Sequence, residues 1–215
     1  MKLSSMPKTS TFDAERDLEI IDRRVASQGF FRFEKLRLRH RRFDGSWSGE
    51  FDRELLRIPR AVCVLPYDPQ RDIVLLIEQF RTGAIDHEGG PWLLECIAGL
   101  MEDHEDPPTT ARREVGEEAG IEVDRLERVG VYAPSPGAVS ERTTMFIARF
   151  DAGSVSAGIH GLDDENEDIR THLVTFDQAL ELIDCERITA ANAQLLLRWL
   201  QINRDNLRQR WGAPA

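Results

Sequence analysis

The sequence predicts a mixed α/β (α+β) fold rather than a regular alternation of strands and helices. Most apolar runs have the length and the Val, Ile and Phe content of strands, and short turns separate most of them. One short helical pattern interrupts these runs near residue 110, and further helical patterns follow the last run. A regular βαβ array needs a helix after nearly every strand, so this order favours a mixed domain.

Composition narrows the possible partners. A chain of 215 residues is long enough for one sizeable core with a smaller appended element. The formal net charge of −10 disfavours a nucleic-acid backbone as the main partner. We see no apolar run of membrane-spanning length and no signal-peptide pattern, so we expect a cytoplasmic protein without a membrane partner. The three scattered cysteines, Cys63, Cys96 and Cys185, fit reduced thiols better than disulfides.

Residues 1–58 predict a small antiparallel β element ahead of the core. Residues 13–28 are charged and give only a weak helical or irregular signal. LRLRHRRF (36–43) and FDRELLRI (51–58) are candidate strands, and DGSWSG (44–49) between them is turn material. The two strands therefore form a predicted hairpin.

The core begins after residue 58. Its predicted strands are AVCVLPY (61–67), DIVLLIEQF (72–80), WLLECIAG (92–99), RVGVYA (128–133), RTTMFIARF (142–150) and DIRTHLVTF (168–176). The first two are almost continuously apolar, which indicates a sheet covered on both faces. Helices are predicted at 177–184, with Asp177 as the N-cap, and at 189–211, which carries an apolar stripe. We assign 59–211 to the main domain and 212–215 to a tail.

A short helix is predicted between Asp106 and Gly120. Pro107 and Pro108 suit its first turn, where their missing N–H groups would be unsatisfied anyway, and Gly120 suits its C-terminal end. Gly116 lies inside the helix and weakens it by roughly 1 kcal/mol relative to alanine. Our explanation for this glycine is close packing of the helix on a neighbour.

Three carboxylates share one face of this helix. Glu114, Glu117 and Glu118 stand at i, i+3 and i+4, which spans about 100° of arc. One interpretation is an ordinary solvated acidic face. The other is a site for Mg²⁺ or Mn²⁺, because the loop at 102–106 adds further carboxylates and such crowding is costly unless cations share it.

The spacing around this helix resembles a known motif. Gly99, five residues, Glu105, seven residues and then REVGEEAGI (113–121) match the Nudix box G-x5-E-x7-R-E-U-x-E-E-x-G-U at every fixed position. IEQFR (77–81), SPGAVSER (135–142) with Pro136, and GLDDENEDIR (161–170) are similar to segments of bacterial ADP-ribose pyrophosphatases of this family. The resemblance implies a Nudix fold, in which a mixed sheet is sandwiched between helices and an antiparallel β element precedes it.

The same resemblance implies an activity. We expect Mg²⁺-dependent hydrolysis of the pyrophosphate of ADP-ribose to AMP and ribose 5-phosphate, with Mn²⁺ as a possible substitute. One alternative is a hydrolase of another nucleoside diphosphate sugar such as GDP-mannose. Another is a non-catalytic module that binds nucleotides, although such domains tend to lose box glutamates and all are present here.

The resemblance also implies roles for residues. The expected metal ligands are the carbonyl of Ala98 and the side chains of Glu114, Glu117, Glu118 and Glu167. The expected structural positions of the box are Gly99, Glu105, Arg113 and Gly120. Glu117 either assists the metals through water or pairs with Arg113. Glu105 is either a ligand or, as we prefer, the partner that holds Arg113.

The remaining expected roles concern the base and the substrate. Glu165 is assigned as general base and Glu167 as a metal contact, and the reverse assignment stays open. The expected substrate contacts are Phe30 and Arg53 at the adenine, Arg81 at the diphosphate, Leu100 in the pocket and Glu141 at the terminal ribose. Because the N-terminal element crosses to a second subunit in the related enzymes, we also expect a homodimer.

Overall fold

The structure, a computed structural model, describes residues 12–162 and 166–212. The chain divides into two compact units. One consists of Met1–Ile58 with Ser135–Ser140, and the other consists of Pro59–Pro134 with Glu141–Ala215. Nothing in the sequence pattern indicates that the segment at 135–140 joins the first unit. None of the helices in the described ranges is long and apolar enough to cross a membrane.

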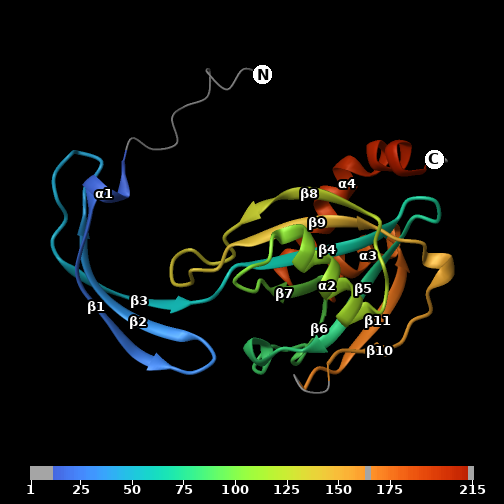
Figure 1. The fold of residues 1–215 in the computed structure, drawn as a ribbon, viewed down its shortest axis with the longest axis horizontal. Helices are drawn as coiled ribbons and strands as arrows, with labels where there is room; N and C mark the ends of the chain where they lie inside the picture. The colour runs from blue at the N-terminus through green and yellow to red at the C-terminus, as the bar shows by residue number, and fades with distance from the viewer. Residues whose placement is uncertain (1–11, 163–165, 213–215) are drawn as a thin grey trace. The chain divides into compact units, whose positions relative to one another are not determined.

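The first unit is a three-stranded antiparallel sheet. A short helix, α1 (Ala14–Asp17), leads into β1 (Leu18–Gln28), which pairs with β2 (Arg32–His40), and β2 pairs with β3 (Phe51–Arg57) (Figure 1). The prediction of a helical or irregular segment at 13–28 is therefore wrong for most of its length. Two register shifts interrupt the β1–β2 ladder, and every residue of β1 is exposed, so the alternating pattern that reveals a strand is absent.

The second unit contains an eight-stranded mixed sheet. Its strands are β4 (Ala61–Asp68), β5 (Ile73–Phe80), β6 (Trp92–Glu95), β7 (Ile97–Leu100), β8 (Arg125–Tyr132), β9 (Thr143–Arg149), β10 (Ile159–His160) and β11 (Ile169–Thr175). The main order is β10-β11-β5-β4-β9-β8, while β6 pairs with β5 and β7 pairs with β4. The β4–β9 pair is parallel, and the other pairs of this sheet are antiparallel.

Helices cover both faces of this sheet. In β4, Cys63 and Leu65 point into the core under α3 (Phe176–Asp184) and α4 (Ala191–Gly212). Val62 and Val64 point to the opposite face, where α2 (Pro107–Ala119) packs (Figure 1). Every residue of β4 is buried. The predicted fold class and the predicted covering of both faces are confirmed.

Two local predictions need correction. The run at 92–99 forms two strands that break at Cys96, because β6 pairs with β5 and β7 pairs with β4. Helix α3 begins at Phe176, and its N-cap is Thr175 rather than Asp177. Thr175 and Gln178 form a reciprocal capping box, in which each side chain accepts a hydrogen bond from the backbone N–H of the other residue.

Our explanation for Gly116 is also wrong. A Cβ built on this residue meets no heavy atom within 4 Å, so the helix is not closely packed there. We therefore expect Gly116→Ala to raise the free energy of unfolding by roughly 0.5–1 kcal/mol, because alanine loses less backbone entropy in a helix. Urea unfolding of the two proteins checks this through an increase in the midpoint at constant m-value. A decrease in the midpoint would contradict the open environment of Gly116.

Candidate metal site and active site

Helix α2 is defined by signals at both of its ends. The Asp106 side chain accepts a hydrogen bond from the Thr109 N–H at 2.9 Å, and Pro107 and Pro108 fill the first turn. Gly120 ends the helix with φ +63°, and its N–H donates to the Gly116 carbonyl at 3.0 Å. The helix is therefore bounded as the sequence predicts, with the three glutamates in its last two turns.

Glu114 and Glu118 are buried between α2 and the sheet. They are 7% and 2% exposed, and they lie beside Val115 and Ala119, which are fully buried. Only Glu117 of the three glutamates remains partly exposed. The interpretation of a solvated acidic face is therefore wrong for two of the three carboxylates.

The backbone of β7 shapes the space for both carboxylates. A Cβ built on Gly99 would lie 1.9 Å from the carboxyl carbon of Glu114, so the Glu114 carboxylate occupies the place that a side chain at Gly99 would need. The Ala98 N–H donates to Glu118 Oε2 at 3.1 Å. The glycine and its neighbour thus hold the two carboxylates against the strand.

This arrangement concentrates negative charge that nearby arginines offset only in part. Burial raises the pKa of Glu114 to about 7, although Arg113 opposes the shift. Burial, followed by repulsion from Glu114, raises the pKa of Glu118 well above its usual value. Repulsion from Glu167 contributes to both shifts, so this third carboxylate lies near the pair. Buried carboxylates of this kind suit a divalent cation, which replaces their mutual repulsion with coordination.

Arg113 connects the box helix to its upstream loop. Its Nε and Nη2 donate to the two oxygens of Glu105 at 3.0 Å each, and Nη2 also donates to the Leu100 carbonyl at 3.2 Å. The guanidinium holds the pKa of Glu105 at about 2. Glu105 also accepts hydrogen bonds from the Thr110 hydroxyl and the Glu102 N–H, so both of its carboxylate oxygens already have hydrogen-bond donors within the protein.

Arg113 also contacts two of the glutamates. Its Nη1 lies 2.8 Å from a Glu117 oxygen and 2.9 Å from a Glu114 oxygen. In the part of the chain that the structure describes, no three acidic, histidine or cysteine side chains form a ready-made metal site. Arg113 therefore shares oxygens of Glu114 and Glu117.

The predicted substrate residues fall in different places. Arg81 follows β5, forms an ion pair with Glu95 at 2.7 Å, and acts electrostatically on Glu118. Glu141 accepts a hydrogen bond from the Thr143 hydroxyl at 2.6 Å. Phe30 and Arg53 belong to the first unit, where Phe30 is 86% exposed and Arg53 lies over the ring of Phe51.

Two predicted residues remain, both in the acidic segment GLDDENEDIR (161–170), which we call the acidic loop. Glu165 lies outside the described residues. Glu167 accepts a hydrogen bond from the Leu162 N–H at 3.4 Å and donates its own N–H to the Leu162 carbonyl at 3.2 Å. Sequence reasoning missed Glu95, the partner of Arg81. The only signal for it was its place on the strand that pairs with β5.

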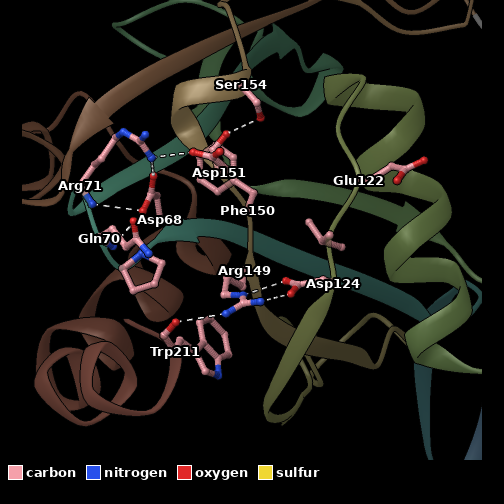
Figure 2. A pocket seen from close by; sticks show the side chains of 12 residues that line it. Asp68, Gln70, Arg71, Glu122, Asp124, Arg149, Phe150, Asp151, Ser154 and Trp211 are labelled. Atoms are coloured by element: carbon pink, nitrogen blue, oxygen red, sulfur yellow. Dashed lines mark hydrogen bonds and ion pairs between the residues drawn. The ribbon is translucent and has the colours of Figure 1, made fainter. Parts of the chain in front are cut away.

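A cavity of about 540 Å³ lies elsewhere in the second unit. Its walls include two arginines that carboxylates already hold (Figure 2). Arg71 pairs with Asp68 at 2.8 Å and Asp151 at 2.6 Å, and Arg149 pairs with Asp124. None of the predicted site residues lines this cavity, so we base the active site on the carboxylates of α2.

Comparisons with known proteins show the family of the chain. Residues 57–198 match the NUDIX domain family. The chain is 42% identical over 211 residues to an ADP-ribose pyrophosphatase of Escherichia coli (strain K12), covering 98% of this chain and 99% of that protein. It is 31% identical over 188 residues to a GDP-mannose pyrophosphatase of Enterobacter sp. (strain 638), covering 86% and 96%.

A solved structure described as an ADP compounds hydrolase has the same fold. It matches with a TM-score of 0.67 at 18% identity, over 92% of this chain and 98% of that chain. The family match runs from the end of β3 into α4, and so includes all of α2 with its buried glutamates. The resemblance found in the box is therefore confirmed, and the chain belongs to the Nudix family.

Proposed function

We propose that this protein is a Mg²⁺-dependent hydrolase that cleaves the pyrophosphate of ADP-ribose to AMP and ribose 5-phosphate. One observation carries the proposal: Glu114 is buried against Gly99 and Glu118 against the Ala98 N–H, inside a complete box. The chain is also similar, over 98% of its length, to an ADP-ribose pyrophosphatase. The box residues needed for hydrolysis are all present, which disfavours a non-catalytic module.

The proposed metal site combines glutamates of the box helix with groups outside the box. Glu114, Glu118 and the Ala98 carbonyl would hold the ion, with Glu167 from the acidic loop and Glu117 in support. Bound Mg²⁺ neutralises diphosphate charge and activates water, which is what hydrolysis of a polyanion requires. Arg113 and Glu105 join the helix to the loop at 102–106 through two parallel hydrogen bonds.

The other proposed roles concern substrate. Arg81 is oriented by Glu95, and its guanidinium offers a fork of N–H donors that matches a diphosphate. Glu141 would contact the terminal ribose, and Leu100 would line the pocket. Glu165 would take the proton from the attacking water. Phe30 and Arg53 would reach the adenine.

We also propose a cytoplasmic homodimer. Leu18, Ile20, Ile21 and Val25 of β1 are exposed, and this apolar surface suits a second copy of the chain. In this proposal, residues 1–58 form the dimer interface and residues 59–211 form the catalytic part. All three cysteines are free thiols, as a reducing compartment favours.

The choice of substrate is tested by initial rates on ADP-ribose, GDP-mannose and ADP-glucose at saturating Mg²⁺. We expect the highest kcat/KM with ADP-ribose. The similarity to a GDP-mannose pyrophosphatase makes GDP-mannose the second candidate. A higher kcat/KM with GDP-mannose would replace the first choice, and no Mg²⁺-dependent turnover of any of the three would remove the proposed function.

The base is tested by Glu165→Gln and Glu167→Gln at saturating Mg²⁺. We expect Glu165→Gln to lower kcat by at least roughly 100-fold, in line with the loss of a general base. Glu167→Gln is expected to raise the Mg²⁺ concentration needed for half-maximal rate more than it lowers kcat. Should Glu167→Gln impair kcat more at saturating Mg²⁺, the two roles are exchanged.

A further inference from the structure

The ring of His160 lies between two glycines on different segments. A Cβ built on Gly120, at the end of α2, would lie 2.9 Å from Cε1 and 3.1 Å from Nδ1 of this ring. A Cβ built on Gly158 would lie 3.0 Å from Nε2. Real Cβ contacts are rarely this short, so the ring fills the space that side chains at both positions would need.

Packing, rather than a hydrogen bond at Nε2, holds this ring in place. Nε2 is buried and has no hydrogen-bond partner among residues 12–162 and 166–212. His160 belongs to β10, and its backbone pairs with Ile169 of β11. Thr171 anchors Gly158, because its N–H donates to the Gly158 carbonyl at 3.0 Å and its hydroxyl accepts from the Gly158 N–H at 2.8 Å. The ring therefore connects β10 and β11 to the C-terminal end of α2.

The two residues that follow His160 both contact Glu167. Gly161 has φ +107°, and a Cβ there would lie 2.7 Å from the Glu167 Cβ and 2.8 Å from its carbonyl oxygen. Leu162 exchanges two hydrogen bonds with Glu167. Glu167 thus lies directly on the residues that follow His160, and a shift of His160 would be passed to its carboxylate.

We propose that His160 is a positioning residue for the divalent-cation site: it wedges β10 against the end of α2 and so holds Glu167 near Glu114 and Glu118. The proposal rests on the proposed function, because it assigns those three carboxylates to the metal. In this arrangement His160 touches neither metal nor substrate. The proposal also gives a second reason for a glycine at position 120, because the residue that caps α2 must leave room for the His160 ring.

The test measures Mn²⁺ binding to the full chain from the electron paramagnetic resonance signal of the free ion. We expect His160→Ala to weaken binding about tenfold, in the range found when residues that orient a metal ligand are lost. The matched control is Ile159→Ala, which removes an apolar side chain from the same strand but one that is 61% exposed. Mn²⁺ affinity of the control should match that of the wild type.

A double-mutant cycle separates positioning from general destabilisation. If His160 acts through Glu167, then His160→Ala should cause little further loss of Mn²⁺ affinity in a Glu167→Gln background. In the kinetic assay, the KM for ADP-ribose should stay within about twofold while the Mg²⁺ concentration for half-maximal rate rises about tenfold. A merely structural role would lower the melting temperature and leave the cation affinity unchanged well below it.

Gly158→Ala perturbs the same contact from the other side and provides a second variant. Its Cβ would press on Nε2, and the backbone of Gly158 is outside the left-handed region, so the substitution acts on the ring. We expect weaker Mn²⁺ binding here also. Wild-type affinity in both His160→Ala and Gly158→Ala, or full additivity with Glu167→Gln, would overturn the positioning role. Failure of the wild type itself to bind Mn²⁺ and to hydrolyse ADP-ribose would instead reject the proposed function.

Discussion

Gly99→Ala is expected to lower kcat/KM for ADP-ribose by at least roughly 100-fold, comparable with removing a charge-stabilising group from an active site. The added methyl would lie 1.9 Å from the carboxyl carbon of Glu114, far inside contact distance. Gly99 is held in β7 opposite Val62 of β4, whereas the Glu114 carboxyl group is the far end of a flexible side chain, so the carboxyl group is what moves. The carboxylate must therefore leave the position that we assign to a metal ligand.

Gly116→Ala is the matched control for this prediction. It makes the same substitution in the same box, but at a position with free space. We expect kcat/KM of this control to remain within about twofold of the wild type. Initial rates over a range of Mg²⁺ concentrations compare the two variants. Retention of more than a third of the wild-type kcat/KM in Gly99→Ala would show that Glu114 need not occupy its present position.

Glu118→Gln is expected to abolish most activity while stabilising the metal-free protein. Loss of the charge should lower kcat at least roughly 100-fold. The amide oxygen of glutamine can still accept the hydrogen bond from the Ala98 N–H. The buried charge, which costs free energy in the absence of a cation, is removed, so the free energy of unfolding should rise by on the order of 1 to 3 kcal/mol near pH 7.5.

The pH dependence of stability has a definite sign. The pKa values of Glu114 and Glu118 are raised in the folded state, Glu114 to about 7, from a usual value of 4.5. Above pH 4.5 the unfolded chain releases these protons while the folded chain still binds them, so their contribution to stability falls as pH rises towards 7. The gain from Glu118→Gln should therefore be larger at pH 7.5 than at pH 5.5.

Urea unfolding in EDTA at both pH values measures this gain. Glu122→Gln is a suitable control, because it removes an exposed carboxylate just beyond the end of α2. Added Mg²⁺ should stabilise the wild type more than Glu118→Gln, since binding to the folded state raises its stability. A stability gain that is equal at the two pH values would contradict a raised pKa of the buried Glu118 carboxyl group.

The sequence was informative where local chemistry decides the structure. Asp106, the prolines and Gly120 predict both ends of α2. The resemblance to the box favours Glu105 as the partner of Arg113, and the structure shows this ion pair between loop and helix. These signals lie within one short segment of the chain. The box could therefore be interpreted without knowing what packs on it.

Non-local pairing was much harder to predict. β1 was missed because two irregularities break its alternation and because its stability comes from pairing with β2 rather than from burial. The pairing of Arg81 with Glu95 and the packing of His160 against Gly120 join residues that no motif connects. Gly116 was misjudged for a related reason, because its surroundings depend on which helix face is covered.

The parallel pairing of β4 and β9 sets an order for folding. Ala61 lies opposite Thr143, so one edge of the central strand has no partner until the chain has been made through β9. Until then, the cover over Val62 and Val64 is incomplete, because β9 contributes Phe146 and Ala148 to the same core. We expect a nascent chain that ends after α2 to lack a stable core, so that cation binding follows synthesis of the second half of the sheet.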